Sequence, residues 1–179
     1  MAWLTELDPE GAPAASAELL NGIIGRHGLA GPMVRLMAHS PALLQGYLDL
    51  SRAMTRAKLP RALSEQISLA VQEWIGCQTC LSAHATAGRA AGLSESDVTL
   101  ARQGVSTDAR ETALLTFAVR VLTEPATLGD GDLAELRGHG WSDRVIADVV
   151  GLVALNQLTG SFNLVAGNQP GTAKSAAPS

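Results

Sequence analysis

Hydrophobic residues recur at helical spacing along most of this chain, and the pattern is clearest between residues 59 and 92. Pro60 suits the first turn of a helix, because the backbone N–H that it lacks has no partner there. Beyond it, apolar residues follow one another three or four positions apart, at Leu63, Ile67, Ala70, Val71 and Trp74. Gly76 then favours a stop. The pattern predicts one helix over about 60–76 and a second over about 77–91, closed by Gly92.

Similar stripes predict helices in the rest of the chain. Candidate N-caps are Ser16, Thr107, Ser142 and Ser94, the last in a capping box with Asp97. The expected helices cover about 16–26, 33–38, 40–57, 94–103, 107–122 and 143–165, with a short segment ending at residue 138. No fixed-period repeat and no useful run of strand-like alternation occurs. The sequence therefore predicts an all-α fold, with a single compact domain over residues 1–166 and a disordered tail over residues 167–179, rich in Pro, Ser, Ala and Gly.

The last predicted helix raises the question of a membrane. Residues 149–166 carry no charge and approach the length that crosses a bilayer. The same stretch contains Asn156, Gln157 and Asn163, whose amides would be costly against lipid. We therefore expect a core helix or a helix at a subunit interface, and no membrane partner.

Composition narrows the functional classes. Charged residues make up only 17% of the 179 residues and apolar residues 46%, which suggests that other subunits of a homo-oligomer cover apolar faces. The net charge of -4 and the lack of a basic stripe argue against a nucleic-acid partner. The N-terminus has acidic residues and proline where a signal peptide has a basic start and an apolar run. Two cysteines placed close together fit a reducing cytosol, so we expect a cytoplasmic protein.

The chemistry-bearing residues gather in the pattern E-x11-C-x2-C-x3-H, formed by Glu65, Cys77, Cys80 and His84. The cysteine pair begins a predicted helix, where unpaired backbone N–H groups favour a thiolate. Residues four apart share a helix face, so Cys80 and His84 should point the same way, with Cys77 one turn earlier and close enough for a disulfide. If the two helices fold back on each other, the Glu65 carboxylate could orient the imidazole, directly or through a water.

Simpler interpretations of the same residues remain open. Buried cysteines often serve only as core residues. The four side chains could together bind zinc, although structural zinc sites usually recruit a second, distant Cys or His pair that this chain lacks. A structural disulfide is a third alternative, but closing so short a loop removes little chain entropy. Glu65 by itself could be a solvated or capping carboxylate on an amphipathic helix.

The pattern resembles the alkyl hydroperoxidase D-like and carboxymuconolactone decarboxylase-like superfamily, specifically its redox-active peroxidase branch. Further similarity lies in residues 38–54 and 111–163, so the resemblance covers about two thirds of the chain. It implies an all-helical homo-oligomer without metal or cofactor, in which Cys77 and Cys80 reduce peroxides while Glu65 and His84 relay protons. Well-studied members carry a second histidine immediately before the second cysteine, and here that position is Thr79. The departure implies a shorter relay, or one completed by water.

The resulting hypothesis is a thiol-dependent peroxidase whose partners are a hydroperoxide substrate and an external dithiol or protein reductant. In it, His84 takes the proton of Cys80, whose thiolate attacks the peroxide, and Cys77 then forms the disulfide. The opposite order of the cysteines stays open. Two alternatives remain: a carboxymuconolactone decarboxylase-like enzyme that uses the fold without redox cycling, and a non-enzymatic thiol redox sensor.

Overall fold

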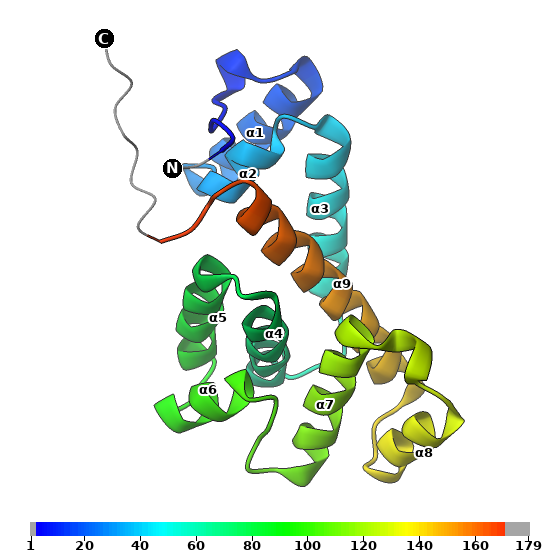
Figure 1. Cartoon of the computed structure of the whole chain (residues 1–179). Helices are drawn as coiled ribbons and strands as arrows, with labels where there is room; N and C mark the ends of the chain where they lie inside the picture. The colour runs from blue at the N-terminus through cyan, green and yellow to red at the C-terminus, as the bar shows by residue number, and fades with distance from the viewer. Residues whose placement is uncertain (1–2, 171–179) are drawn as a thin grey trace. The chain divides into compact units, whose positions relative to one another are not determined.

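A computed structural model describes residues 3–170, which are helical and contain no strand. The helices of this part of the chain are α1 (Ala14–His27), α2 (Pro32–Met37), α3 (Pro41–Met54), α4 (Arg61–Ile75), α5 (Gln78–Ala90), α6 (Glu95–Arg102), α7 (Ala109–Thr123), α8 (Asp130–Gly138) and α9 (Asp143–Val165), and the 3-10 turns are η1 (Pro9–Gly11) and η2 (Pro125–Thr127) (Figure 1). The all-α prediction is therefore confirmed.

The chain divides into two compact units. One contains the residues before Met54 together with those from Phe162 onward, and its core gathers Leu20, Met37, Ala38 and Leu44. The other runs from Met54 to Ser161 and contains every residue of the predicted site. That residues 1–166 form a single domain stays a prediction. Most of the tail predicted over 167–179 lies outside the described residues.

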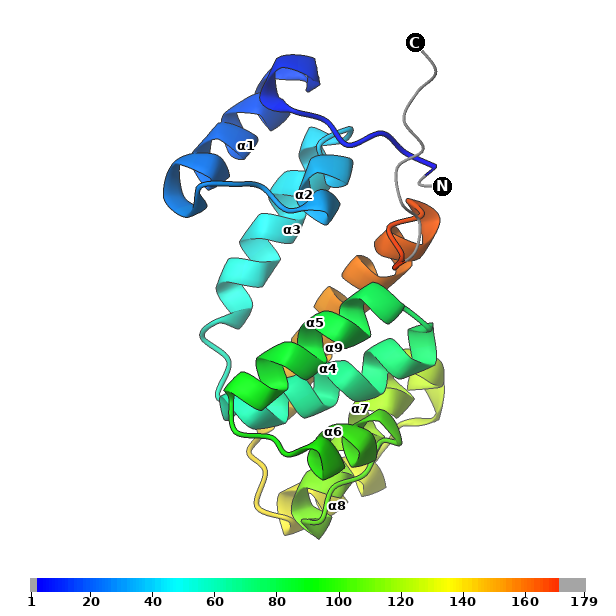
Figure 2. The same ribbon diagram turned by 90° about the vertical axis from the view of Figure 1, so that its left-hand side faces the viewer.

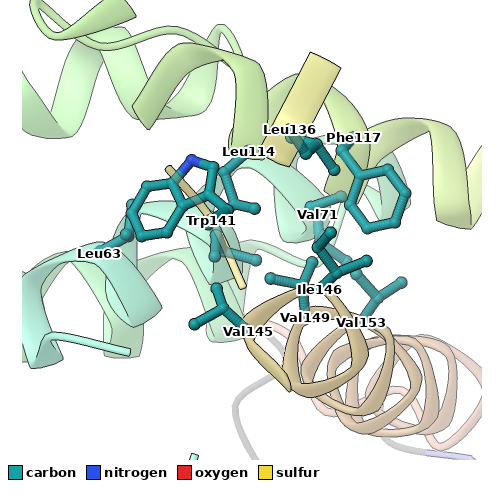
Figure 3. Packing of buried hydrophobic residues seen from close by; sticks show 12 residues of the cluster. Leu63, Val71, Leu114, Phe117, Leu136, Trp141, Val145, Ile146, Val149 and Val153 are labelled. Atoms are coloured by element: carbon teal, nitrogen blue, oxygen red, sulfur yellow. The ribbon is translucent and has the colours of Figure 1, made fainter. Parts of the chain in front are cut away.

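Helix α4 is the central element of the second unit. It packs against α5, α6 and α7, and Figure 2 shows it among them. Two of its residues, Leu63 and Val71, belong to a large apolar core together with Trp141 and Val149 (Figure 3). A second, smaller core lies between α4, α5 and α6 and contains Leu69, Leu81, Leu93, Val98 and Ala101. Because α4 is packed on several sides, side chains that point from it toward α5 are held out of water.

Helix α9 is long and apolar enough to cross a membrane by length and composition alone. In the second unit its residues Val149 and Val153 are instead part of the core, and Asn156 is buried. The Gln72 side-chain amide donates to the Asn156 backbone oxygen at 2.9 Å and to its side-chain oxygen at 3.0 Å, and Asn156 donates to Ser68 at 3.1 Å. This part of α9 thus contributes Val149 and Val153 to the core and has the buried Asn156 amide bonded to α4, while a subunit interface along α9 stays a prediction.

Helix caps were predicted with mixed success. Ser94 caps α6 in a capping box with Asp97, and Ser142 accepts a hydrogen bond from the backbone N–H of Val145 at the start of α9, both as expected. The predictions for Ser16 and Thr107 were wrong. Helix α1 begins after Pro13 with Ser16 buried inside it, and Asp108 caps α7 one residue after the predicted position. At α7 two adjacent polar residues compete for the cap, and spacing alone does not decide between them, whereas α1 begins after Pro13 with no side-chain cap.

Candidate active site

The cysteine pair lies in the turn that joins α4 to α5. Helix α4 ends at Gly76, whose φ of 82° is the left-handed conformation that glycine adopts without strain. The backbone N–H groups of Gly76 and Cys77 both donate to the Gln72 carbonyl, at 2.9 and 3.2 Å. This tight reversal allows α5 to return along α4, so that side chains of the two helices can meet.

Cys77 and Cys80 are joined by a disulfide bond, with their Cα atoms 5.3 Å apart. Cys77 is the N-cap of α5, and its sulfur accepts a hydrogen bond from the Cys80 backbone N–H at 3.3 Å. The predicted position of the pair at a helix N-terminus is therefore confirmed. The two residues differ in burial, because Cys77 is completely buried while Cys80 retains 6% of its accessible surface.

Glu65 and His84 meet across the two helices. The distance from His84 Nδ1 to Glu65 Oε2 is 2.7 Å, and since a carboxylate can only accept, the ring N–H donates. The Glu65 side chain is 4% exposed and that of His84 is 29% exposed. The contact that depended on the two helices folding back is thus direct. It uses Nδ1 and leaves Nε2 as the ring nitrogen that can exchange a proton elsewhere.

Two residues that sequence reasoning passed over complete this geometry. Arg61, one turn before Glu65 on α4, places Nη2 2.5 Å from Glu65 Oε1. Gly88, one turn after His84 on α5, is buried, and a Cβ added there would lie 2.8 Å from Leu93 Cδ1 and 3.5 Å from Glu65 Cβ. The spacing of four between Arg61 and Glu65 was a usable signal. The sequence carried no signal for the close approach at Gly88, because that approach depends on how Leu93 packs.

The four predicted residues therefore form two contacts on the α4–α5 pair: Cys77 with Cys80 at the turn between the helices, and Glu65 with His84 further along them. The disulfide provides two redox-active sulfurs, and the Glu65–His84 pair provides an acceptor for a thiol proton within the same helix pair. In the part of the chain that the structure describes, no three His, Cys, Asp or Glu side chains are arranged to hold a metal ion. The roles of the four residues in catalysis stay predictions.

Comparison with known families and structures agrees with this arrangement. Residues 41–124, which include α4, the cysteine turn and α5, match the model of the carboxymuconolactone decarboxylase family. This segment, a little under half of the chain, is therefore similar to that family. No curated protein sequence matches the chain.

Several solved structures have the same fold as this chain. An uncharacterised peroxidase-related protein from Ralstonia eutropha JMP134, described as an alkylhydroperoxidase AhpD core, has a TM-score of 0.80 at 20% identity over 96% of this chain and 93% of its own. A peroxidase-related protein from Silicibacter sp. TM1040 has a TM-score of 0.75 at 20% identity over 92% and 88% of the two chains. The debrominase Bmp8 with bound 2,3,4-tribromopyrrole reaches 0.71 at 20% identity over 93% and 90%. At these identities the likeness establishes the fold and leaves the reaction open.

Proposed function

We propose that this protein is a thiol-dependent peroxidase that reduces hydroperoxides with Cys77 and Cys80. The observation that carries the proposal is a disulfide-bonded CxxC pair on the same helix as a histidine that is hydrogen-bonded to a buried carboxylate. A redox pair with its own proton acceptor has what two-electron reduction of a peroxide requires. Cysteines that only fill the core, or that form a purely structural disulfide, require no such neighbour.

The first step uses the more accessible sulfur. In the reduced protein, His84 takes the Cys80 proton through Nε2 while Nδ1–H remains bound to Glu65. The Cys80 thiolate attacks the outer oxygen of the hydroperoxide, which breaks the O–O bond and forms a sulfenic acid. The alkoxide that leaves is protonated to an alcohol, or to water when the substrate is hydrogen peroxide, and His84 can return the proton.

The second step regenerates the disulfide seen in the structure. The Cys77 thiolate attacks the sulfenic sulfur of Cys80, a disulfide forms and the hydroxide leaves as water after protonation. Two Cα atoms only 5.3 Å apart need little movement for this step. An external dithiol or protein reductant then reduces the disulfide by thiol–disulfide exchange, and is itself oxidised to a disulfide.

The test starts from reduced, metal-free protein treated with one equivalent of an organic hydroperoxide. We expect loss of both thiols, one equivalent of alcohol, and an intramolecular disulfide in the peptide that carries Cys77 and Cys80. Cys77→Ser should stop after the first step, with a sulfenic acid on Cys80 that dimedone traps. Cys80→Ser should leave the peroxide unconsumed, and survival of both thiols in the native protein would rule the proposal out.

A second candidate uses the same cysteine chemistry on another substrate. The debrominase that shares the fold makes reductive dehalogenation a reaction to test, in which two thiols become a disulfide while a carbon–bromine bond is replaced by carbon–hydrogen and bromide is released. Incubation of the reduced protein with 2,3,4-tribromopyrrole and measurement of bromide distinguishes the two. Enzymatic activity that survives in the double variant Cys77→Ser, Cys80→Ser would favour decarboxylase-like chemistry. A change in oligomer size on oxidation, without peroxide consumption, would favour a redox sensor.

A further inference from the structure

Arg61 occupies a position that helix energetics alone disfavour. It is the first residue of α4, where the partial positive charge of the helix dipole opposes a cation. It also precedes its acidic partner by four residues, which is the less favourable of the two orders for such a pair. A contact that is poor for the helix in both respects calls for a reason outside local helix stability.

The contact itself joins an exposed cation to a buried anion. The Arg61 side chain is 73% exposed and that of Glu65 is 4% exposed, so the guanidinium reaches from solvent to a carboxylate that water hardly contacts. Each carboxylate oxygen has one partner: Arg61 Nη2 on Oε1 at 2.5 Å and His84 Nδ1 on Oε2 at 2.7 Å. The guanidinium and the imidazole therefore hold the carboxylate from both sides.

The other arginines of the helices packed around α4 have partners elsewhere. On the elements that surround α4 in the described part of the chain these pairs are Arg89–Glu95, Arg102–Glu73, Arg120 with Glu124 and Asp132, Arg137–Asp143 and Arg144–Asp148. Arg110 lies over the Trp141 ring and Glu111 accepts from Ser106. Arg61 is therefore the cation that the structure places against Glu65.

We propose that Arg61 is a positioning residue of the proton relay: it binds one oxygen of the Glu65 carboxylate and holds the other turned toward His84 Nδ1. A carboxylate held in this way accepts a hydrogen bond from Nδ1–H, so that the ring proton stays on Nδ1 and Nε2 remains the basic nitrogen. A neutral or rotated carboxyl group would allow the other tautomer, in which Nε2 carries the proton and cannot take one from Cys80. The inference rests on the proposed function for its purpose, but the arrangement that it describes can be measured without a peroxide.

The test measures cysteine alkylation and histidine tautomer in the reduced protein. Rates of iodoacetamide reaction at Cys77 and Cys80 are followed by mass spectrometry across pH, and His84 is assigned in nitrogen-15 NMR spectra by its loss in His84→Gln. For Arg61→Gln, a larger share of the tautomer whose Nε2 cannot take the Cys80 proton should raise the midpoint of the alkylation profile by about 0.5 to 1 pH unit, which is a threefold to tenfold slower reaction below the midpoint. The native protein should show the proton on His84 Nδ1, and Arg61→Gln a mixture of tautomers.

Arg102→Gln is the matched control, because it removes the same charge from a partly exposed arginine that pairs with Glu73 on the outer side of α4. It should leave both readouts at native values. Arg61→Lys, which retains the charge, should restore most of the alkylation midpoint, and it also serves if Arg61→Gln folds poorly. The inference is overturned if Arg61→Gln matches the control in both readouts, or if Arg61→Lys shifts as far as Arg61→Gln. A native tautomer result together with no peroxide consumption would instead reject the proposed function alone.

Discussion

Replacement of Glu65 by glutamine tests how strongly the relay depends on a carboxylate. The carboxylate accepts one hydrogen bond on each oxygen, from Arg61 and from His84. A glutamine side chain has nearly the same shape but offers one acceptor and one donor group. If its oxygen faces Arg61, its NH2 group faces His84 Nδ1, which must then accept and place the ring proton on Nε2. If the amide is turned the other way, its NH2 group opposes the guanidinium.

Either orientation has a cost that can be estimated from this geometry. Leaving a buried donor without an acceptor costs about 1–3 kcal/mol, because its hydration is lost without replacement. For a chain of this length, each kcal/mol lowers the midpoint of thermal unfolding by about 2–4 °C. The wrong tautomer removes the general base, whose contribution is typically about 10²- to 10⁴-fold in rate. We expect Glu65→Gln to be folded, less stable by about 2 kcal/mol and slower by at least about 100-fold in peroxide reduction.

The assay is hydroperoxide consumption with dithiothreitol as reductant, beside urea unfolding of the oxidised protein. Glu73→Gln makes the same chemical change on the same helix, where the partner Arg102 lies at 2.7 Å and both side chains are partly exposed. Exposed pairs contribute at most about 1 kcal/mol, so this variant should have nearly native stability and rate. If Glu65→Gln and Glu73→Gln behave alike, the carboxylate has no special function in the relay.

The remaining predictions concern stability. A Cβ at Gly160 would lie 2.5 Å from Gln72 Oε1, a fully buried side chain, so Gly160→Ala should destabilise the protein by about 1–3 kcal/mol despite better helix propensity, as thermal unfolding would show. The pKa of Asp132 is lowered by the hydrogen bond from the Gly129 backbone and by Arg120. A carboxyl group whose pKa is lowered by folding stabilises the folded protein above its unfolded-state pKa of about 3.9, and this stabilisation is lost as pH falls through the folded-state pKa. The free energy of unfolding in urea should therefore fall less between about pH 5 and pH 2 in Asp132→Asn than in the native protein. Equal pH dependence in the two proteins would contradict this.

The helices around the site were predictable because their signals are local. Pro60 and Gly76 act through their own backbone conformations. Gly76 ends α4 as expected, while Pro60, expected in the first turn, is the N-cap immediately before it. The position of Cys77 at the start of α5 followed from the same turn. The sequence and the family resemblance together identified the helix pair that carries the cysteines.

The contacts between helices were predictable only as possibilities. The direct bond between Glu65 and His84 depends on how closely α4 and α5 approach, and Gly88 permits that approach beside Leu93. The spacing of residues within one helix does not determine the distance between side chains on two different helices. Arg61 was overlooked although its spacing of four from Glu65 was visible in the sequence. A cation at the start of a helix, four residues before an acid, adds little to helix stability, so the pair did not stand out.

In the proposed peroxidase cycle, the unequal burial of the two cysteines would give the reaction a direction in both halves. Cys80, the more accessible residue, is the one that a peroxide or a reductant can reach, while Cys77 is completely buried. When a reductant thiolate attacks Cys80, the sulfur of Cys77 leaves as a thiolate, and thiol–disulfide exchange is faster when the leaving thiol has a low proton affinity. The Cys77 sulfur lies at the N-terminus of α5 and accepts the Cys80 backbone N–H, which favours this leaving thiolate. In this proposed cycle His84 would act on Cys80 and the helix terminus on Cys77, so that each thiolate is stabilised by a different group.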